Sequence, residues 1–98
     1  MITSKQRAYL RSMATELPAI MQIGKGGLSE NLIKTFSDAL EARELIKVHV
    51  LENSGESPKE IIRMLAEALD AEPVAVVGKK IVLYRASEKN PTIELPRA

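Results

Sequence analysis

Three of the five residues from Ile23 to Gly27, in the sequence IGKGG, are glycine, although the whole chain of 98 residues has only five glycines. Glycine accepts positive φ and lets a backbone approach another molecule closely. Lys25 adds a positive charge, and a helical pattern begins at Ser29. The loop would therefore present free N–H groups near a helix N-terminus, where the helix dipole attracts anions. These features predict a phosphate-binding loop, and a tight turn with an incidental lysine is the alternative.

The spacing of the glycines limits which phosphate compound could bind. The mononucleotide pattern Gly-x-x-x-x-Gly-Lys-Ser/Thr does not occur, and the dinucleotide pattern Gly-x-Gly-x-x-Gly fails because position 29 is serine. The Gly-x-x-Gly pattern, with which KH-type modules clamp single-stranded RNA, does occur. It consists of Gly24, Lys25, Gly26 and Gly27. KH loops join two helices, whereas this one is expected to join a strand to a helix, so the analogy is partial.

Composition argues against several other kinds of site. The chain has no cysteine and one histidine, so we expect neither a disulfide nor a metal site built on thiolate or imidazole ligands. His49 lies beside Lys47 without a nucleophile nearby in the sequence, so we expect no enzyme, no cofactor and no small-molecule substrate. The sequence has no signal peptide and no apolar run that approaches the length of a membrane span. We expect a cytoplasmic protein without a membrane partner.

The net charge of +1 conceals an uneven distribution of charged residues. Residues 1–27 and 73–98 are each rich in lysine and arginine, whereas acidic residues outnumber basic ones by six to two in residues 52–72. A nearly neutral protein can in this way present one basic and one acidic face. A mixed, solvated surface is equally compatible with these charges.

Capping signals and hydrophobic spacing predict the elements around the glycine loop. Thr3 and Gln6 form a capping box for a first helix, which Pro18 would end. Residues 19–23 are predicted to form a short strand. Ser29 would cap a second helix that runs to about Arg43.

The second half of the chain contains the clearest strand, residues 45–51, with alternating apolar and polar residues. Ser57 and Pro58 begin a third helix, with Glu60 closing a capping box. Two strands, 74–77 and 80–85, are separated by Gly78-Lys79, which is typical of a tight hairpin.

The order helix, strand, helix, strand, helix, strand, strand predicts an α/β fold in a single domain. Strand–helix–strand units favour right-handed crossovers. We therefore expect a four-stranded mixed sheet with a mainly parallel core, an antiparallel pair from the final hairpin, and helices packed on it. The domain is expected to span residues 1–86. Residues 87–98, with two prolines and little apolar content, are expected to form a loosely ordered tail.

Three motifs that recur together point to one family. They are QIGKGGLS at residues 22–29, ELIKV at 44–48 and GKKIVLYR at 78–85. In these motifs and in element order over about residues 2–86, the chain resembles the bacterial CRM-domain (YhbY) proteins. The resemblance implies an RNA-binding domain similar in topology to the C-terminal domain of translation initiation factor three. It also implies binding to ribosomal RNA during assembly of the large ribosomal subunit.

We expect the RNA-binding surface to combine the glycine loop with basic side chains, and we expect a monomer. The expected residues are Gly24, Lys25, Gly26, Gly27, Lys5, Arg7, Arg11, Lys34, Lys79 and Lys80. Tyr84 is expected to pack in the core rather than to stack on bases. The alternative function is a protein-interaction module that binds a basic partner through the acidic residues 52–72.

Overall fold

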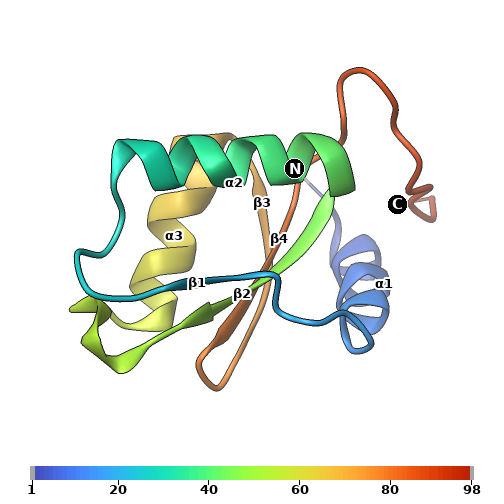
Figure 1. Cartoon of the computed structure of the whole chain (residues 1–98). Helices are drawn as coiled ribbons and strands as arrows, with labels where there is room; N and C mark the ends of the chain where they lie inside the picture. Colours follow the sequence, from blue (N-terminus) through green and yellow to red (C-terminus); the bar gives the residue numbers. More distant parts are fainter. Residues whose placement is uncertain (1, 98) are drawn as a thin grey trace.

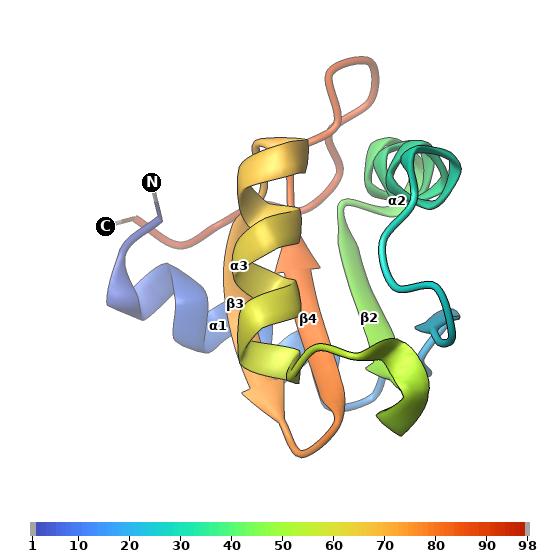
Figure 2. The same cartoon turned by 90° about the vertical axis from the view of Figure 1, so that its left-hand side faces the viewer.

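A four-stranded sheet with the order β1-β2-β4-β3 forms the middle layer of the protein, whose computed structural model describes residues 2–97. Helices α2 and α3 pack on one face of the sheet and α1 packs on the other (Figure 1). Figure 2 shows α1 and α3 on opposite sides of β3 and β4. The elements are α1 (Ser4–Ala14), β1 (Met21–Ile23), α2 (Glu30–Arg43), β2 (Leu45–Val50), the 3-10 helix η1 (Glu52–Ser54), α3 (Pro58–Leu69), β3 (Glu72–Val77) and β4 (Lys80–Tyr84).

The predicted element order and the mixed sheet are confirmed, but the sheet is not mainly parallel. Only β1 and β2 form a parallel pair, with Met21 opposite Val48. Strand β4 runs antiparallel to both β2 and β3. The prediction of a mainly parallel core is wrong because β4 lies between the two strands that α3 connects. The crossover leaves a gap in the sheet, and the hairpin strand fills it.

Side-chain caps explain where the three helices begin. Thr3 and Gln6 form the complete predicted capping box, and the hydroxyl of Ser29 accepts a hydrogen bond from the Leu32 amide. Ser57 likewise accepts from the amide of Glu60. The carboxylate of Glu60 pairs with Arg63 instead of completing a box. Helix α1 ends at Ala14, before the proline that was expected to stop it.

Two apolar cores fill the space on the two faces of the sheet. The larger core contains Phe36 from α2, which is fully buried, together with residues of α3 and the alternate residues Ile46, Val48 and Val50 of β2. The smaller core contains Leu10 of α1 and Tyr84 of β4. The packing role predicted for Tyr84 is confirmed, since only 6 % of this residue is exposed.

Residues 85–97, which follow β4, form no helix or strand, but a buried carboxylate fixes them to the domain. Glu44 is 1 % exposed and accepts hydrogen bonds from the amides of Ser87 (2.8 Å), Thr92 (2.7 Å) and Ile93 (2.9 Å). Ile93 also packs against the smaller core. The prediction of a loosely ordered tail did not include these contacts. They depend on the buried acceptor oxygens of Glu44, which the proline content of the tail does not indicate. Met1 and Ala98 lie outside the described residues.

The environment of Glu44 favours its charged form. Burial raises the pKa of this carboxyl group, but the hydrogen bonds from Ser87, Thr92 and Ile93 together outweigh burial, and the pKa lies below its usual value of 4.5. Glu41 assists at the edge of the same contact. Its carboxylate accepts from the Ser87 hydroxyl and from the amide of Glu88, and these bonds lower its pKa as well.

Glu44→Gln tests this anchor. The substitution keeps the shape of the side chain but removes the charge and replaces one acceptor oxygen by a donor, so at least one buried amide loses its partner. We expect the free energy of unfolding near neutral pH to fall by about 1–3 kcal/mol, as measured by urea denaturation. The exposed residue Glu67 on α3 provides the control, because Glu67→Gln should change stability by less than about 0.5 kcal/mol.

The pH dependence of this difference is a second readout. Since the pKa of Glu44 is lowered in the folded state, its stabilising effect is complete above the unfolded pKa and is lost as pH falls through the folded pKa. The stability gap between the wild type and Glu44→Gln should therefore shrink below about pH 4. A gap that stays constant into this acidic range contradicts the proposed role of the charge.

Candidate functional site

The glycine loop forms a tight turn directly after β1. The Gly27 amide donates a hydrogen bond to the Gly24 carbonyl over 3.0 Å, which closes a four-residue turn with Lys25 and Gly26 at its tip. Gly26 has a φ of 98° and Gly27 a φ of 60°. Both values lie in the region that favours glycine. The turn therefore requires glycine for its backbone and exposes Lys25 to solvent.

Close packing adds a second constraint at two of the three glycines. A Cβ atom on Gly24 would lie 3.2 Å from the Leu51 side chain, and one on Gly27 would lie 3.3 Å from the Ser54 carbonyl oxygen. A Cβ atom on Gly26 would meet nothing within 4 Å. The absence of a side chain at Gly24 and Gly27 thus allows the turn to pack closely against residues 51–54. Gly26 leaves an open approach to the backbone at the tip.

The turn directs unused backbone donors toward solvent. Within residues 2–97, the amides of Lys25 and Gly26 donate to no protein acceptor, whereas the Gly27 amide is used inside the turn. Helix α2 begins shortly afterwards, and its N-terminal dipole favours an anion there. Lys34 is exposed in its second turn. The exposed carboxylate of Glu30, in the first turn of α2, offsets the positive potential of the helix N-terminus. Lys25 is therefore the main source of positive charge at the tip of the turn.

Three further cations lie beside α1, on the face of the sheet opposite α2 and α3. Arg11 of α1, Lys47 of β2 and Lys80 of β4 line a groove of about 290 Å³. Ala75, Val77 and Val82 also line this groove, which we call the α1–sheet groove, together with Ala14 and Thr15. Arg11 and Lys80 are among the residues expected from the sequence. Lys47 was missed as a site residue, although strand alternation places it on this face.

Strand register connects the α1–sheet groove with the glycine turn. Lys80 pairs with His49, and His49 pairs with Gln22. Directly paired residues share one face of a sheet, and neighbouring strands lie about 4.8 Å apart. The row from Lys80 to Gln22 therefore spans about 10 Å and ends two residues before Gly24. This row connects the groove with the strand that leads into the glycine turn.

The structure does not bring all of the predicted cations into this surface. Lys79, in the hairpin turn, pairs with Glu52, and the hydrogen bond from Lys79 lowers the pKa of that carboxyl group. The Arg7 guanidinium donates to the Pro73 carbonyl of β3 over 3.0 Å. Lys5 is exposed in the first turn of α1. None of these three residues lines the α1–sheet groove, and Lys79 is partly neutralised by its ion pair.

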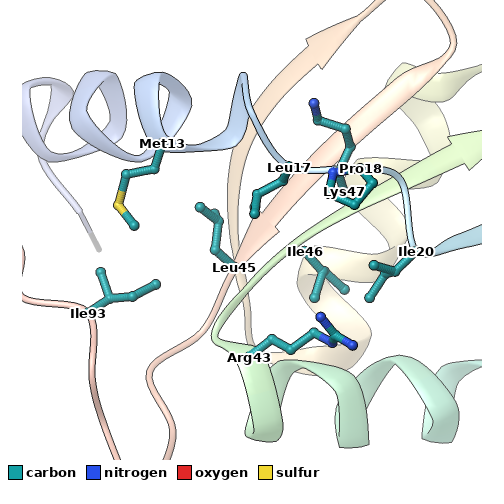
Figure 3. A pocket seen from close by; sticks show the side chains of 9 residues that line it. All are labelled: Met13, Leu17, Pro18, Ile20, Arg43, Leu45, Ile46, Lys47 and Ile93. Carbon is teal, nitrogen blue, oxygen red and sulfur yellow. The ribbon is translucent and has the colours of Figure 1, made fainter.

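A second pocket, of about 350 Å³, shares Lys47 with the α1–sheet groove and has a mainly apolar lining. Figure 3 shows it between the end of α1, the start of β2 and Ile93 of the tail, with the Lys47 amino group pointing away from the apolar side chains. Its lining residues are Met13, Leu17, Pro18, Ile20, Arg43, Leu45, Ile46, Lys47 and Ile93. They include no carboxylate, imidazole or hydroxyl group. Lys47 and Arg43 are its ionisable side chains, and the Lys47 amino group points away from the apolar residues.

Two other kinds of site find no support in residues 2–97. Among these residues, no three histidine or acidic side chains form a group that could hold a metal ion. None of the three helices is long and apolar enough to cross a membrane.

Known proteins match this chain over almost its full length. Relatives include the probable RNA-binding protein YqeI of Bacillus subtilis, 47% identical over 98% of this chain and 100% of the relative, and an RNA-binding protein of Haemophilus influenzae, 34% identical over 98% and 96%. The solution structure of the hypothetical protein SAV1595 from Staphylococcus aureus superposes with a TM-score of 0.82 at 54% identity, covering 98% of this chain and 100% of that one. The family model of the CRS1 / YhbY (CRM) domain matches residues 2–85. This protein therefore belongs to the CRS1 / YhbY (CRM) domain family.

Proposed function

We propose that the protein binds RNA, without catalysing a reaction, through the glycine turn and the cationic row beside it. The observation that carries this proposal is the turn itself. It combines an exposed Lys25, two amides with no protein acceptor and an open approach at Gly26. Near-full-length relatives named as RNA-binding proteins give independent support.

A phosphate group suits this geometry for simple reasons. Backbone amides are fixed donors, so an anion that accepts from Lys25 and Gly26 gains hydrogen bonds without ordering further side chains. The Lys25 ammonium adds an attraction that is independent of base sequence. Gly26 has no Cβ atom that would narrow the approach of an anion to these donors. The turn thus contacts the RNA backbone and positions the strand, while carrying little sequence information.

The finer part of the proposal is that the RNA is ribosomal RNA of the large-subunit precursor, bound by a monomer during assembly. This part rests on family membership. The distribution of aromatic residues is compatible with it, because Phe36 and Tyr84 are buried and Tyr9 is the exposed aromatic side chain. Without an aromatic platform for several bases, the domain is suited to recognise RNA by backbone and shape, as folded ribosomal RNA would require.

The alternative of a protein-interaction module has weaker support. It relies on the acidic residues 52–72, but the carboxylate of Glu52 pairs with Lys79 and that of Glu60 with Arg63. Ion pairs within the chain leave less negative charge for a basic partner.

Lys25→Ala tests the charge at the tip. It removes one cation but leaves the glycine turn intact, so it should weaken binding of different RNAs alike. The dependence of log affinity on log salt concentration should fall by about one unit, as for one lost phosphate contact. Lys89→Ala is the matched control, because Lys89 belongs to the tail after β4, and Figure 1 shows this tail on the opposite side of the molecule from the loop between β1 and α2. Equal effects of the two variants would exclude a specific role for the turn.

Gly26→Asp and Gly26→Ala together separate charge from backbone shape. Both variants place a Cβ atom in open space at a φ of 98°, so both should lose about 1–2 kcal/mol of stability through backbone strain. The aspartate also sets an anion at the proposed phosphate site and should weaken RNA binding more than Lys25→Ala does. Binding should be measured beside the thermal midpoint. The proposal fails if the aspartate and alanine variants bind RNA equally well in their folded fractions.

Crosslinking in growing cells tests which RNA is bound. We expect the crosslinked sequences to be enriched in large-subunit ribosomal RNA and its precursor, relative to small-subunit and messenger RNA. A strain that carries Gly26→Asp at the same protein level should lose this enrichment. Enrichment of another RNA class that depends equally on Gly26 would leave RNA binding intact and overturn the ribosomal assignment.

A further inference from the structure

The α1–sheet groove contains three cations for which residues 2–97 provide no ion-pair partner. Across residues 2–97, no ion pair joins Arg11, Lys47 or Lys80 to a carboxylate. Its lining residues include no acidic side chain. Elsewhere in the described residues, Lys79 and Arg63 do pair with carboxylates. Three like charges around one small groove repel one another, and a bound anion would relieve this repulsion.

The groove also exposes apolar surface. Val77, on the edge strand β3, is 66 % exposed, and it lines the groove with Ala75 and the buried Val82. An anion alone would leave this surface in water. A ligand that carries both a negative charge and a flat apolar group would neutralise the rim and cover the valines, and a nucleotide has both parts.

The volume of the groove limits how much of a ligand it can hold. At about 290 Å³ it lies at the lower end of the range of ligand sites, which is roughly 300–1,000 Å³. It therefore suits one flat group rather than a base-paired segment. Lys80 begins the row that leads through His49 to the glycine turn, so the same RNA strand can occupy both places.

Stacking in the groove depends on arginine. None of the residues that line it is aromatic, and two of the three aromatic residues in the chain are buried. Bases in single-stranded RNA also stack on the planar guanidinium group of arginine, which lysine cannot imitate. Arg11, on the α1 wall, is the only lining residue with such a plane.

We infer that the α1–sheet groove binds one unpaired nucleotide of the RNA strand whose backbone contacts the glycine turn. The base lies between the Arg11 guanidinium and the apolar lining at Val77 and Val82. Lys47 and Lys80 bind the adjacent phosphates. This inference rests on the proposed function and adds to it a preference for RNA with an unpaired base.

The test compares three RNA hairpins that differ at one place in the stem: one with a single unpaired nucleotide, one in which that nucleotide lacks its base, and one fully paired. Wild-type protein should bind the first hairpin at least about tenfold more tightly than the other two, within the range for stacking of one base. Arg11→Lys keeps the charge but removes the plane. It should abolish most of this preference and leave the salt dependence unchanged.

Matched variants make each outcome decisive. Arg63→Lys on α3 is the control and should keep the preference, whereas Val77→Glu should weaken binding of all three hairpins by adding a carboxylate to the groove. If Arg11→Lys keeps the preference, or wild type has none, the inference is overturned. Lys25→Ala is measured beside them. If Lys25→Ala weakens binding but the wild type shows no base preference, only the inference about the groove is refuted. If neither Lys25→Ala nor Val77→Glu changes binding, the proposed function is refuted as well.

Discussion

The junction at Glu44 holds most elements of the fold together. This residue ends α2 with a φ of 67°, and its carbonyl accepts from the Arg85 amide at the end of β4. The Arg85 guanidinium in turn donates to the Ser37 and Leu69 carbonyls of α2 and α3. A buried carboxylate is costly without hydrogen bonds, and the tail supplies them. One junction therefore connects α2, the C-terminal end of α3, the end of β4 and the tail.

The insertion of β4 between β2 and β3 is the step that creates the candidate surface. It sets Lys80 opposite His49 and two residue pairs away from Lys47, although the two lysines lie on different strands far apart in the sequence. Helix α1 then covers only part of this face, and Arg11 reaches the uncovered part. If β3 had paired with β2, as a simple crossover would give, Lys80 would lie at the sheet edge and the groove would not form.

Local signals predicted the parts of the structure that local physics decides. Thr3, Ser29 and Ser57 mark helix starts because each hydroxyl satisfies an amide within the same turn. Alternation in β2 likewise assigned Lys47 and His49 to one face. The position of β4, the anchored tail and the role of Lys47 depend on contacts between residues more than thirty positions apart, which leave no local pattern. The face of the sheet that α1 covers also depends on such long-range contacts. Arg11 and Lys80 were therefore predicted as separate site residues, but their position beside one groove was not predicted.

Packing constrains two of the three glycines of the turn, and the third leaves room for a ligand. The number of unpaired cations nearby limits the electrostatic part of binding. Gly24 and Gly27 are held by contacts with Leu51 and Ser54, while Gly26 faces open space. Glu52 neutralises Lys79, so the turn and the α1–sheet groove contribute four cations, which are Arg11, Lys25, Lys47 and Lys80. Four cations bound to single-stranded RNA would give a salt dependence of only about −3 on logarithmic axes. Electrostatic attraction of this size is modest, so tight binding on this surface requires the backbone donors of the turn and the apolar contact that the α1–sheet groove offers.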